Sequence, residues 1–312
     1  MEKKIATRDA YGKALVALGQ SNEKIVVLDA DLAKSTKTID FAKAIPERFF
    51  DIGIAEQNMI GIAAGLAASG KIPFASSFAM FATGRAFEQI RNSVAYPKLN
   101  VKIAATHAGI TVGEDGGSHQ TVEDIGIMRS VPNMTIVVPA DAVETEKAVK
   151  AIAAYEGPVY LRLGRPAVPV LYDESYTFQL GKASFLQQGQ DVTIIATGIM
   201  VSKALEAAKL LAEEGIQAEV INMSTIKPLD EEAILQSVKK TGRVVTAEEH
   251  SIIGGLGSAV AELVTEHFPV PVRRVGIKDV FGESGTPGQL LEKFNLTPQA
   301  IVEAVKKIME QK

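Results

Sequence analysis

Apolar, β-branched runs alternate with segments of helical periodicity along almost the whole chain. This alternation is typical of parallel α/β sheets, in which a helix connects each strand to the next. A first series of strands is predicted at 25–30, 71–76, 101–106, 134–139 and 158–163, with helices at 80–95 and 142–155. A second series has strands at 192–198, 218–223, 243–249 and 271–277, with helices at 201–214, 230–240 and 297–312. The expected fold class is therefore α/β.

The pattern lapses once, in a stretch with two prolines and scattered polar residues. We therefore expect two three-layer α/β/α domains. The first has a parallel sheet and spans residues 1–170, and a linker follows over 171–190. The second is smaller, has a mostly parallel sheet and spans residues 191–312. A chain of 312 residues agrees with this division, because single hydrophobic cores rarely serve more than about 250–300 residues.

Composition excludes several classes of function. The chain has no cysteine, which excludes disulfides, thiolate metal sites and a thiol nucleophile. Its 33 basic and 37 acidic residues give a net charge of −4 without a basic block, so no nucleic-acid partner is expected. The apolar stretch 57–82 is broken by Pro73 and is predicted to be a buried helix and strand, so no membrane partner is expected either. We expect a cytoplasmic protein with no metal ligands of its own.

The densest polar segment, THAGITVGEDGGSHQ at 106–120, directly follows a predicted strand. Open parallel sheets bind ligands at such positions. His107 and His119 are too few for a metal site without carboxylates, so hydrogen-bonding or proton-transfer roles are favoured. A solvated surface loop is an equally good interpretation of this segment alone.

Three other residues have both a structural and a functional interpretation. Glu56 begins an apolar helix, where the helix dipole favours a carboxylate. Burial there also raises the pKa of a carboxylate and demands a specific partner, which suits a proton relay. Phe78 and Phe81 are three residues apart, and core packing is the usual reason for that spacing.

The segments TRDAYG, LDADLAKST, DIGIAEQN, SSFAMF, THAGITVGEDGGSHQ and LRLGRP occur in this order. Together they resemble the C-terminal half of transketolases, which is a pyrimidine-binding domain followed by the transketolase C-terminal domain. The GDG…N motif, which holds the cofactor's diphosphate and its metal ion in that family, has no counterpart here. The resemblance therefore identifies the chain as one subunit of a split transketolase.

The resemblance implies transfer of a two-carbon ketol unit from a ketose phosphate to an aldose phosphate, a reaction of the pentose phosphate pathway. The implied cofactors are thiamine diphosphate and Mg²⁺, or another divalent cation, bound through the partner. The implied partner is an N-terminal subunit that carries the GDG…N motif. Self-association is also implied, as a homodimer core within a heterotetramer.

The resemblance assigns catalytic roles to Glu56 and His119. Glu56 is similar to the glutamate that hydrogen-bonds N1′ of the cofactor's pyrimidine and thereby promotes loss of the C2 proton. The other assignments comprise the cofactor-binding residues Phe78, Phe81 and Asp31, the sugar-hydroxyl contacts Asp115 and His119, and the sugar-phosphate contacts Arg8, Ser35, His107 and Arg165.

The sequence departs from the family pattern at two glycines. Gly84 stands where many microbial transketolases have a tyrosine, and Gly117 replaces the proline of the usual GEDGP loop. The GIAEQN segment is shared with deoxyxylulose-phosphate synthases and resembles 2-oxoacid dehydrogenase β-subunits, so these remain alternatives. Synthases typically have arginine at the position of His107 and alanine at that of Glu114. A non-catalytic subunit of the same fold is a further alternative.

Overall fold

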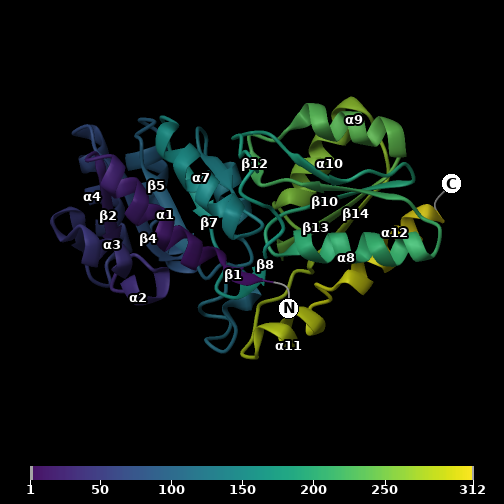
Figure 1. Cartoon of the computed structure of the whole chain (residues 1–312), viewed down its shortest axis with the longest axis horizontal. Helices are drawn as coiled ribbons and strands as arrows, with labels where there is room; N and C mark the ends of the chain where they lie inside the picture. Colours follow the sequence, from purple (N-terminus) through teal and green to yellow (C-terminus); the bar gives the residue numbers. More distant parts are fainter. Residues whose placement is uncertain (1–2, 311–312) are drawn as a thin grey trace.

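The computed structural model describes residues 3–310 and contains two large β-sheets, each enclosed by helices (Figure 1). The first sheet has seven strands in the order β12-β6-β7-β5-β4-β2-β3. Its strands are β2 (Ile25–Asp29), β3 (Phe49–Asp51), β4 (Ile72–Phe78), β5 (Lys102–Thr106), β6 (Thr135–Val137), β7 (Val159–Arg162) and β12 (Thr225–Lys227). All neighbouring strands are parallel except β12, which pairs antiparallel with β6.

Helices cover both faces of the first sheet. One face packs against α1 (Thr7–Ser21), α3 (Ile39–Ala44) and α7 (Ala142–Ala154). The other face packs against α4 (Glu56–Ala68), the π-helical segments η2 (Phe81–Arg85) and η3 (Ile90–Ala95), and α6 (Asp124–Ser130). Along β2 the buried side chains alternate between the two faces, with Val27 in one core and Leu28 in the other. Burial on both faces explains why the predicted strands are continuous apolar runs.

The second sheet has five strands in the order β14-β13-β10-β11-β9. Its strands are β9 (Ser184–Gln187), β10 (Val192–Ala196), β11 (Ala218–Asn222), β13 (Val244–Ser251) and β14 (Val272–Ile277). All neighbours are parallel except β9, which pairs antiparallel with β11. Figure 1 shows α8 (Met200–Glu213) and α12 (Pro298–Met309) along one face, and α9 (Glu231–Thr241) and α10 (Leu256–His267) along the other. The expected fold class, two α/β/α layer arrangements with mostly parallel sheets, is confirmed.

The two sheets are joined by more than the chain between them. Strand β12 follows β11 in sequence but adds to the edge of the first sheet. One hydrophobic core runs without a break from the α4 and α6 face of the first sheet to the α9 and α10 face of the second. A short antiparallel pair, β1 (Lys4–Ala6) with β8 (Ala167–Pro169), lies between the two sheets (Figure 1).

Several features differ from the sequence-based expectations. The helix expected at 80–95 forms as η2, a short α5 (Phe87–Gln89) and η3, so most of it is π-helical rather than α-helical. Strand β9 falls within the segment 171–190 that was expected to be a linker. The short strands β1, β3, β8 and β12 were not predicted. The remaining short elements are α2 (Ala33–Thr36), η1 (Pro46–Arg48), η4 (Ile110–Val112) and α11 (Pro287–Lys293). No helix within residues 3–310 is long and apolar enough to cross a bilayer.

Candidate active site

Most of the predicted site residues follow the carboxyl ends of five adjacent strands of the first sheet. Strands β7, β5, β4, β2 and β3 lie in this order, and their carboxyl ends share one edge because the strands are parallel. The residues on this edge are Arg165 after β7, His107, Asp115 and His119 after β5, Phe78 and Phe81 at the end of β4, Asp31 and Ser35 after β2, and Glu56 after β3. Arg8 reaches the same edge from the first turn of α1.

Glu56 is the first residue of α4 and is only 3% exposed. Its carboxylate has a charged partner, because Nη1 of Arg85 lies 3.2 Å from Oε1 and 3.3 Å from Oε2. Arg85 ends the π-helical segment η2 and keeps 51% of its side chain exposed. Arg85 was not predicted from the sequence as a site residue. The sequence does contain one indication of its position. Arg85 follows Phe81 by four residues, a spacing that places both side chains on one side of a helix.

A row of flat side chains extends from this ion pair along the edge of the sheet. The Arg85 guanidinium carbon lies 4.2 Å from the centroid of the Phe81 ring. Phe81 stacks on Phe78 with centroids 5.9 Å apart, and Phe78 stacks on His107 with centroids 3.9 Å apart. His119 meets Phe81 edge-on at 5.1 Å. Core packing is therefore an incomplete interpretation of Phe78 and Phe81, because Phe81 is only half-buried and forms an aromatic wall beside Glu56.

His107 ends this row in a buried position between two hydrogen-bond partners. Its Nδ1 lies 2.8 Å from the Thr106 hydroxyl, and its Nε2 lies 3.1 Å from Nη1 of Arg8. Its φ of +57° is uncommon for a residue with a side chain. Burial, together with the charges of Arg8 and Arg165, lowers the pKa of His107 to about 3. The imidazole is therefore neutral at physiological pH.

Positive charge gathers around the neutral imidazole of His107. Arg8 donates from Nη1 to the backbone carbonyl of Ser35 at 3.0 Å. Burial lowers the pKa of Arg8, and the nearby charge of Arg165 adds to this effect. Lys37 acts on His107 in the same direction. Three cations around one buried neutral ring make this part of the edge suited to an anion.

Three predicted residues lie outside this row of contacts. Arg165 donates from Nη1 to the carbonyl of Val112 and forms an ion pair with Glu114, at 3.0 Å from Nη1 to Oε2. Asp115 is exposed on the same loop as Glu114. Asp31 is also exposed, and its backbone N–H donates to the carboxylate of Asp51 at 3.0 Å.

Asp29 was also missed, although it ends an apolar strand where polar residues are informative. It is fully buried, and its carboxylate accepts from the Leu32 N–H at 2.6 Å and from the hydroxyls of Thr36 and Thr38 at 2.7 and 2.8 Å. Burial raises the pKa of Asp29 to about 6, against the opposing effect of these hydrogen bonds. These contacts fix the turn that carries Ser35. Asp29 therefore positions the backbone carbonyl of Ser35, which accepts a hydrogen bond from Arg8.

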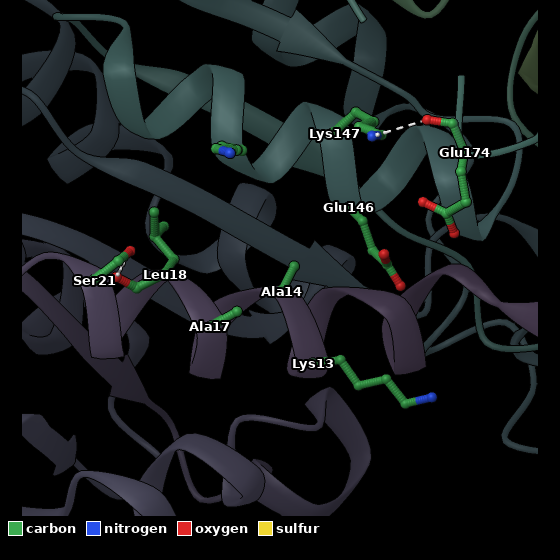
Figure 2. Close-up of a pocket in the computed structure, with 9 residues that line it drawn as sticks. Lys13, Ala14, Ala17, Leu18, Ser21, Glu146, Lys147 and Glu174 are labelled. Carbon is green, nitrogen blue, oxygen red and sulfur yellow. Dashed lines mark hydrogen bonds between the residues drawn. The ribbon is translucent and has the colours of Figure 1, made fainter. Parts of the chain in front are cut away.

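A groove of about 460 Å³ lies between α1 and α7, away from this edge (Figure 2). Its alanine and leucine side chains come from α1, whereas α7 contributes only lysine and glutamate, and none of the predicted site residues lines it. Within residues 3–310, no three His, Cys, Asp or Glu side chains are grouped closely enough to hold a metal ion.

Comparison with known proteins shows which family the chain belongs to. The family model described as "Transketolase, pyrimidine binding domain" matches residues 3–170, and "Transketolase, C-terminal domain" matches residues 181–301. The chain belongs to the transketolase family. This result confirms the resemblance found in the sequence.

Individual transketolase relatives match over nearly the whole chain. A Methanocaldococcus jannaschii protein, named for the C-terminal section of a transketolase, is 55% identical and covers 97% of this chain and 95% of its own length. A 6-deoxy-6-sulfo-D-fructose transketolase subunit of Clostridium sp. strain MSTE9 is 52% identical over 98% of this chain and 95% of its own length. A solved structure, described as a split-gene transketolase in an inactive beta4 tetramer, is 62% identical, with a TM-score of 0.92 and 98% coverage of both chains.

Membership of the transketolase family implies dependence on thiamine diphosphate. The geometry of the edge fits the pyrimidine end of that cofactor. The carboxylate of Glu56 accepts hydrogen bonds from the flat guanidinium of Arg85, and this guanidinium also lies over the ring of Phe81.

The structure explains one of the two departures from the transketolase pattern and describes the other. A Cβ at Gly117 would lie 2.7 Å from the carbonyl oxygen of Gly282, a backbone atom of the segment before α11. Glycine at this position therefore allows the 106–120 loop to pack closely against the second half of the chain. A Cβ at Gly84 would lie 2.6 Å from the terminal methyl of Met80, so this flexible side chain fills space beside Gly84.

Proposed function

We propose that this chain is the subunit of a split thiamine-diphosphate-dependent transketolase that supplies the pyrimidine side of the cofactor site. The complete enzyme transfers a two-carbon ketol unit from a ketose phosphate to an aldose phosphate. It is active only when a second subunit provides the diphosphate and Mg²⁺ side of the site.

The observation that carries this proposal is the row of contacts that begins at Glu56 and continues through Arg85, Phe81 and Phe78 to His107. A buried carboxylate beside an aromatic wall suits a flat base that carries N–H donors. The region of positive charge at the other end of the row suits the anionic group of a substrate.

Thiamine diphosphate, when bound, supplies the nucleophilic carbon for the transfer. Glu56 accepts a hydrogen bond from the pyrimidine and relays a proton at its carboxylate oxygen. Phe78 and Phe81 orient the ring by stacking. His119, half-exposed beside Phe81, moves a proton at its imidazole nitrogen and contacts a sugar hydroxyl together with Asp115.

The substrate's terminal anion binds to Arg8 and Arg165. Two neighbours hold Arg8 in place, Ser35 through its carbonyl and His107 through Nε2, and both accept from Nη1 of Arg8. A phosphate is our first choice, and phosphorylated pentoses would place the reaction in the pentose phosphate pathway. A sulfonate is the second candidate, because the Clostridium relative is named for a sulfo-sugar. Both anions are tetrahedral groups of acceptor oxygens, so the same cations recognise either one.

The partner is an N-terminal transketolase subunit that carries a GDG…N motif. We expect this chain to self-associate as a homodimer core within a heterotetramer, with Asp31 near the cofactor and the dimer interface. The tetramer of a single subunit type in the 62% identical structure supports self-association, and its inactive state supports a need for the partner.

Calorimetry with thiamine diphosphate and Mg²⁺ tests the proposal. The purified chain offers half a site, so it should bind the cofactor weakly, whereas the complex with the N-terminal subunit should bind it tightly. Tight, metal-dependent binding by the chain alone would overturn the split site, and a complex that fails to bind would indicate a non-catalytic subunit. Phosphorylated and sulfonated ketoses, compared as donors, then distinguish the two substrates.

A further inference from the structure

Arg85 contacts both of the side chains that the proposed function assigns to the cofactor's pyrimidine. Its Nη1 lies 3.2 and 3.3 Å from the two carboxylate oxygens of Glu56. Its guanidinium carbon lies 4.2 Å from the centroid of Phe81. One flat cation therefore uses the hydrogen-bond acceptor and the aromatic face at the same time.

A guanidinium and an aminopyrimidine share the features that these two side chains recognise. Both are flat and both stack on aromatic rings, and the pyrimidine, like the guanidinium, presents an N–H donor to Glu56 when its N1′ carries a proton. We propose that Arg85 occupies the pyrimidine subsite as a reversible internal competitor, and that it leaves Glu56 and Phe81 when the cofactor binds. This inference rests on the proposed function, because it requires that the pyrimidine bind at Glu56.

The geometry allows Arg85 to leave without disturbing the fold. Its side chain is 51% exposed, whereas that of Glu56 is 4% exposed, so the cation can rotate into solvent while the carboxylate stays in place. Both N–O distances exceed the usual range of about 2.7–2.9 Å for charged pairs, which indicates a weak bond. The backbone at Arg85 is held separately, because Gln57 donates from Nε2 to its carbonyl at 3.0 Å.

The contact also gives a physical reason for having a competitor. A buried carboxylate without a partner is costly, and the cost persists until the cofactor arrives. Arg85 compensates the charge of Glu56 in the cofactor-free chain. The site therefore keeps its shape before binding, and part of the binding free energy is spent on displacing Arg85.

Cofactor affinity of the reconstituted complex tests this inference. Arg85→Met removes the charge and the donors but keeps an unbranched side chain, and Arg85→Ala serves as a second variant. Calorimetry with thiamine diphosphate and Mg²⁺ should show binding that is roughly 5- to 30-fold tighter than wild type, because a partly exposed ion pair and a cation–π contact no longer compete. Unchanged or weaker binding would overturn the inference, since it would mean that Arg85 is neutral or itself binds the cofactor.

Arg91 provides the matched control. It is an exposed arginine of η3 that hydrogen-bonds to its neighbour Asn92 at 2.6 Å, so Arg91→Ala should leave cofactor affinity at the wild-type value. A gain in affinity equal to that of Arg85→Met would show a general effect of net charge and would contradict the specific role of Arg85.

Thermal melting of the cofactor-free chain separates this inference from the proposed function. Arg85→Met should lower Tm when Glu56 is present and should have a smaller effect in a Glu56→Gln background, because the amide carries no charge to compensate. The same loss in both backgrounds would show that Arg85 does not compensate Glu56. A wild-type complex that fails to bind the cofactor would contradict the proposed function and leave this melting result unaffected.

Discussion

Arg8 determines which nitrogen of His107 carries the proton. A guanidinium only donates hydrogen bonds, so Nε2 of His107, 3.1 Å from Nη1 of Arg8, must be the acceptor. The proton therefore lies on Nδ1 and is donated to the Thr106 hydroxyl at 2.8 Å. This tautomer leaves His107 uncharged among cations, where it accepts from Arg8 without repelling the guanidinium.

The depressed pKa of His107 predicts a dependence of stability on pH. A histidine in an unfolded chain has a pKa of about 6.5, whereas the pKa of His107 in the folded chain is about 3. Between these values the unfolded state binds a proton that the folded state does not, so the free energy of unfolding falls as the pH falls, by up to about 1.4 kcal/mol per pH unit. Asparagine tolerates a positive φ and has no group that titrates in this range, so His107→Asn removes the proton-binding site without straining the backbone.

Urea unfolding of His107→Asn between pH 6 and pH 4 should therefore give a shallower loss of stability than wild type. His267, exposed at the end of α10, provides the control for the loss of a histidine, and His267→Asn should follow the wild-type slope. Equal slopes for wild type and His107→Asn would show that His107 does not carry this pH dependence.

Arg162 of β7 forms a buried ion pair with Asp124 of α6 and also donates to β13 of the second sheet, so its substitution should be costly. Arg162 donates from Nε to Asp124 at 2.6 Å and from Nη2 to the carbonyl of Glu249 at 2.9 Å. Burial alone raises the pKa of Asp124, but the charge of Arg162 overcomes this and the net shift is downward. Arg162→Leu leaves Asp124 buried without its cation, so urea unfolding should show a loss of about 3–5 kcal/mol.

The pair between Lys306 and Glu214 is the exposed counterpart of this ion pair. Lys306 Nζ lies 2.6 Å from Glu214 Oε2, and both side chains are more than two-fifths exposed, at 44% and 49%. Lys306→Ala should therefore cost less than about 1 kcal/mol. Similar losses for Arg162→Leu and Lys306→Ala would contradict the view that burial sets the cost.

Arg165 distinguishes a role in phosphate binding from a structural role. Its ion pair with Glu114 and its bond to the Val112 carbonyl also suit an anchor for the 106–120 loop. If it binds phosphate, Arg165→Ala should lower kcat/KM for a phosphorylated ketose about 10- to 100-fold more than for an unphosphorylated donor such as hydroxypyruvate. Equal losses with both donors, together with a lower Tm, would assign Arg165 to the loop alone.

The central strands and the edge that carries the site could be predicted from the sequence. Strands β2, β4 and β5 are buried on both faces, so apolar residues predominate along them. Parallel strands end at the same edge, so the residues that follow them come together there. The structure brings Glu56, Phe81 and the other members of the row together there.

Other features depend on contacts that periodicity does not encode. The π-helical segments replace an expected α-helix because apolar spacing does not distinguish i+4 from i+5 hydrogen bonding. Strand β12 has three residues and pairs with β6 of the first sheet, although it follows β11 of the second sheet in sequence, so no local pattern marks it. Arg85 and Glu56 are 29 residues apart, and only the folded chain shows that they pair.

The most direct test of the central claim is exchange of the C2 proton of thiamine diphosphate for deuterium in the reconstituted complex, comparing wild type with Glu56→Gln. The amide keeps the shape of the side chain but cannot relay a proton, so we predict that exchange slows by about two to four orders of magnitude while Tm changes little. The chain without its partner should not accelerate exchange. Wild-type exchange rates in the Glu56→Gln complex would contradict the account.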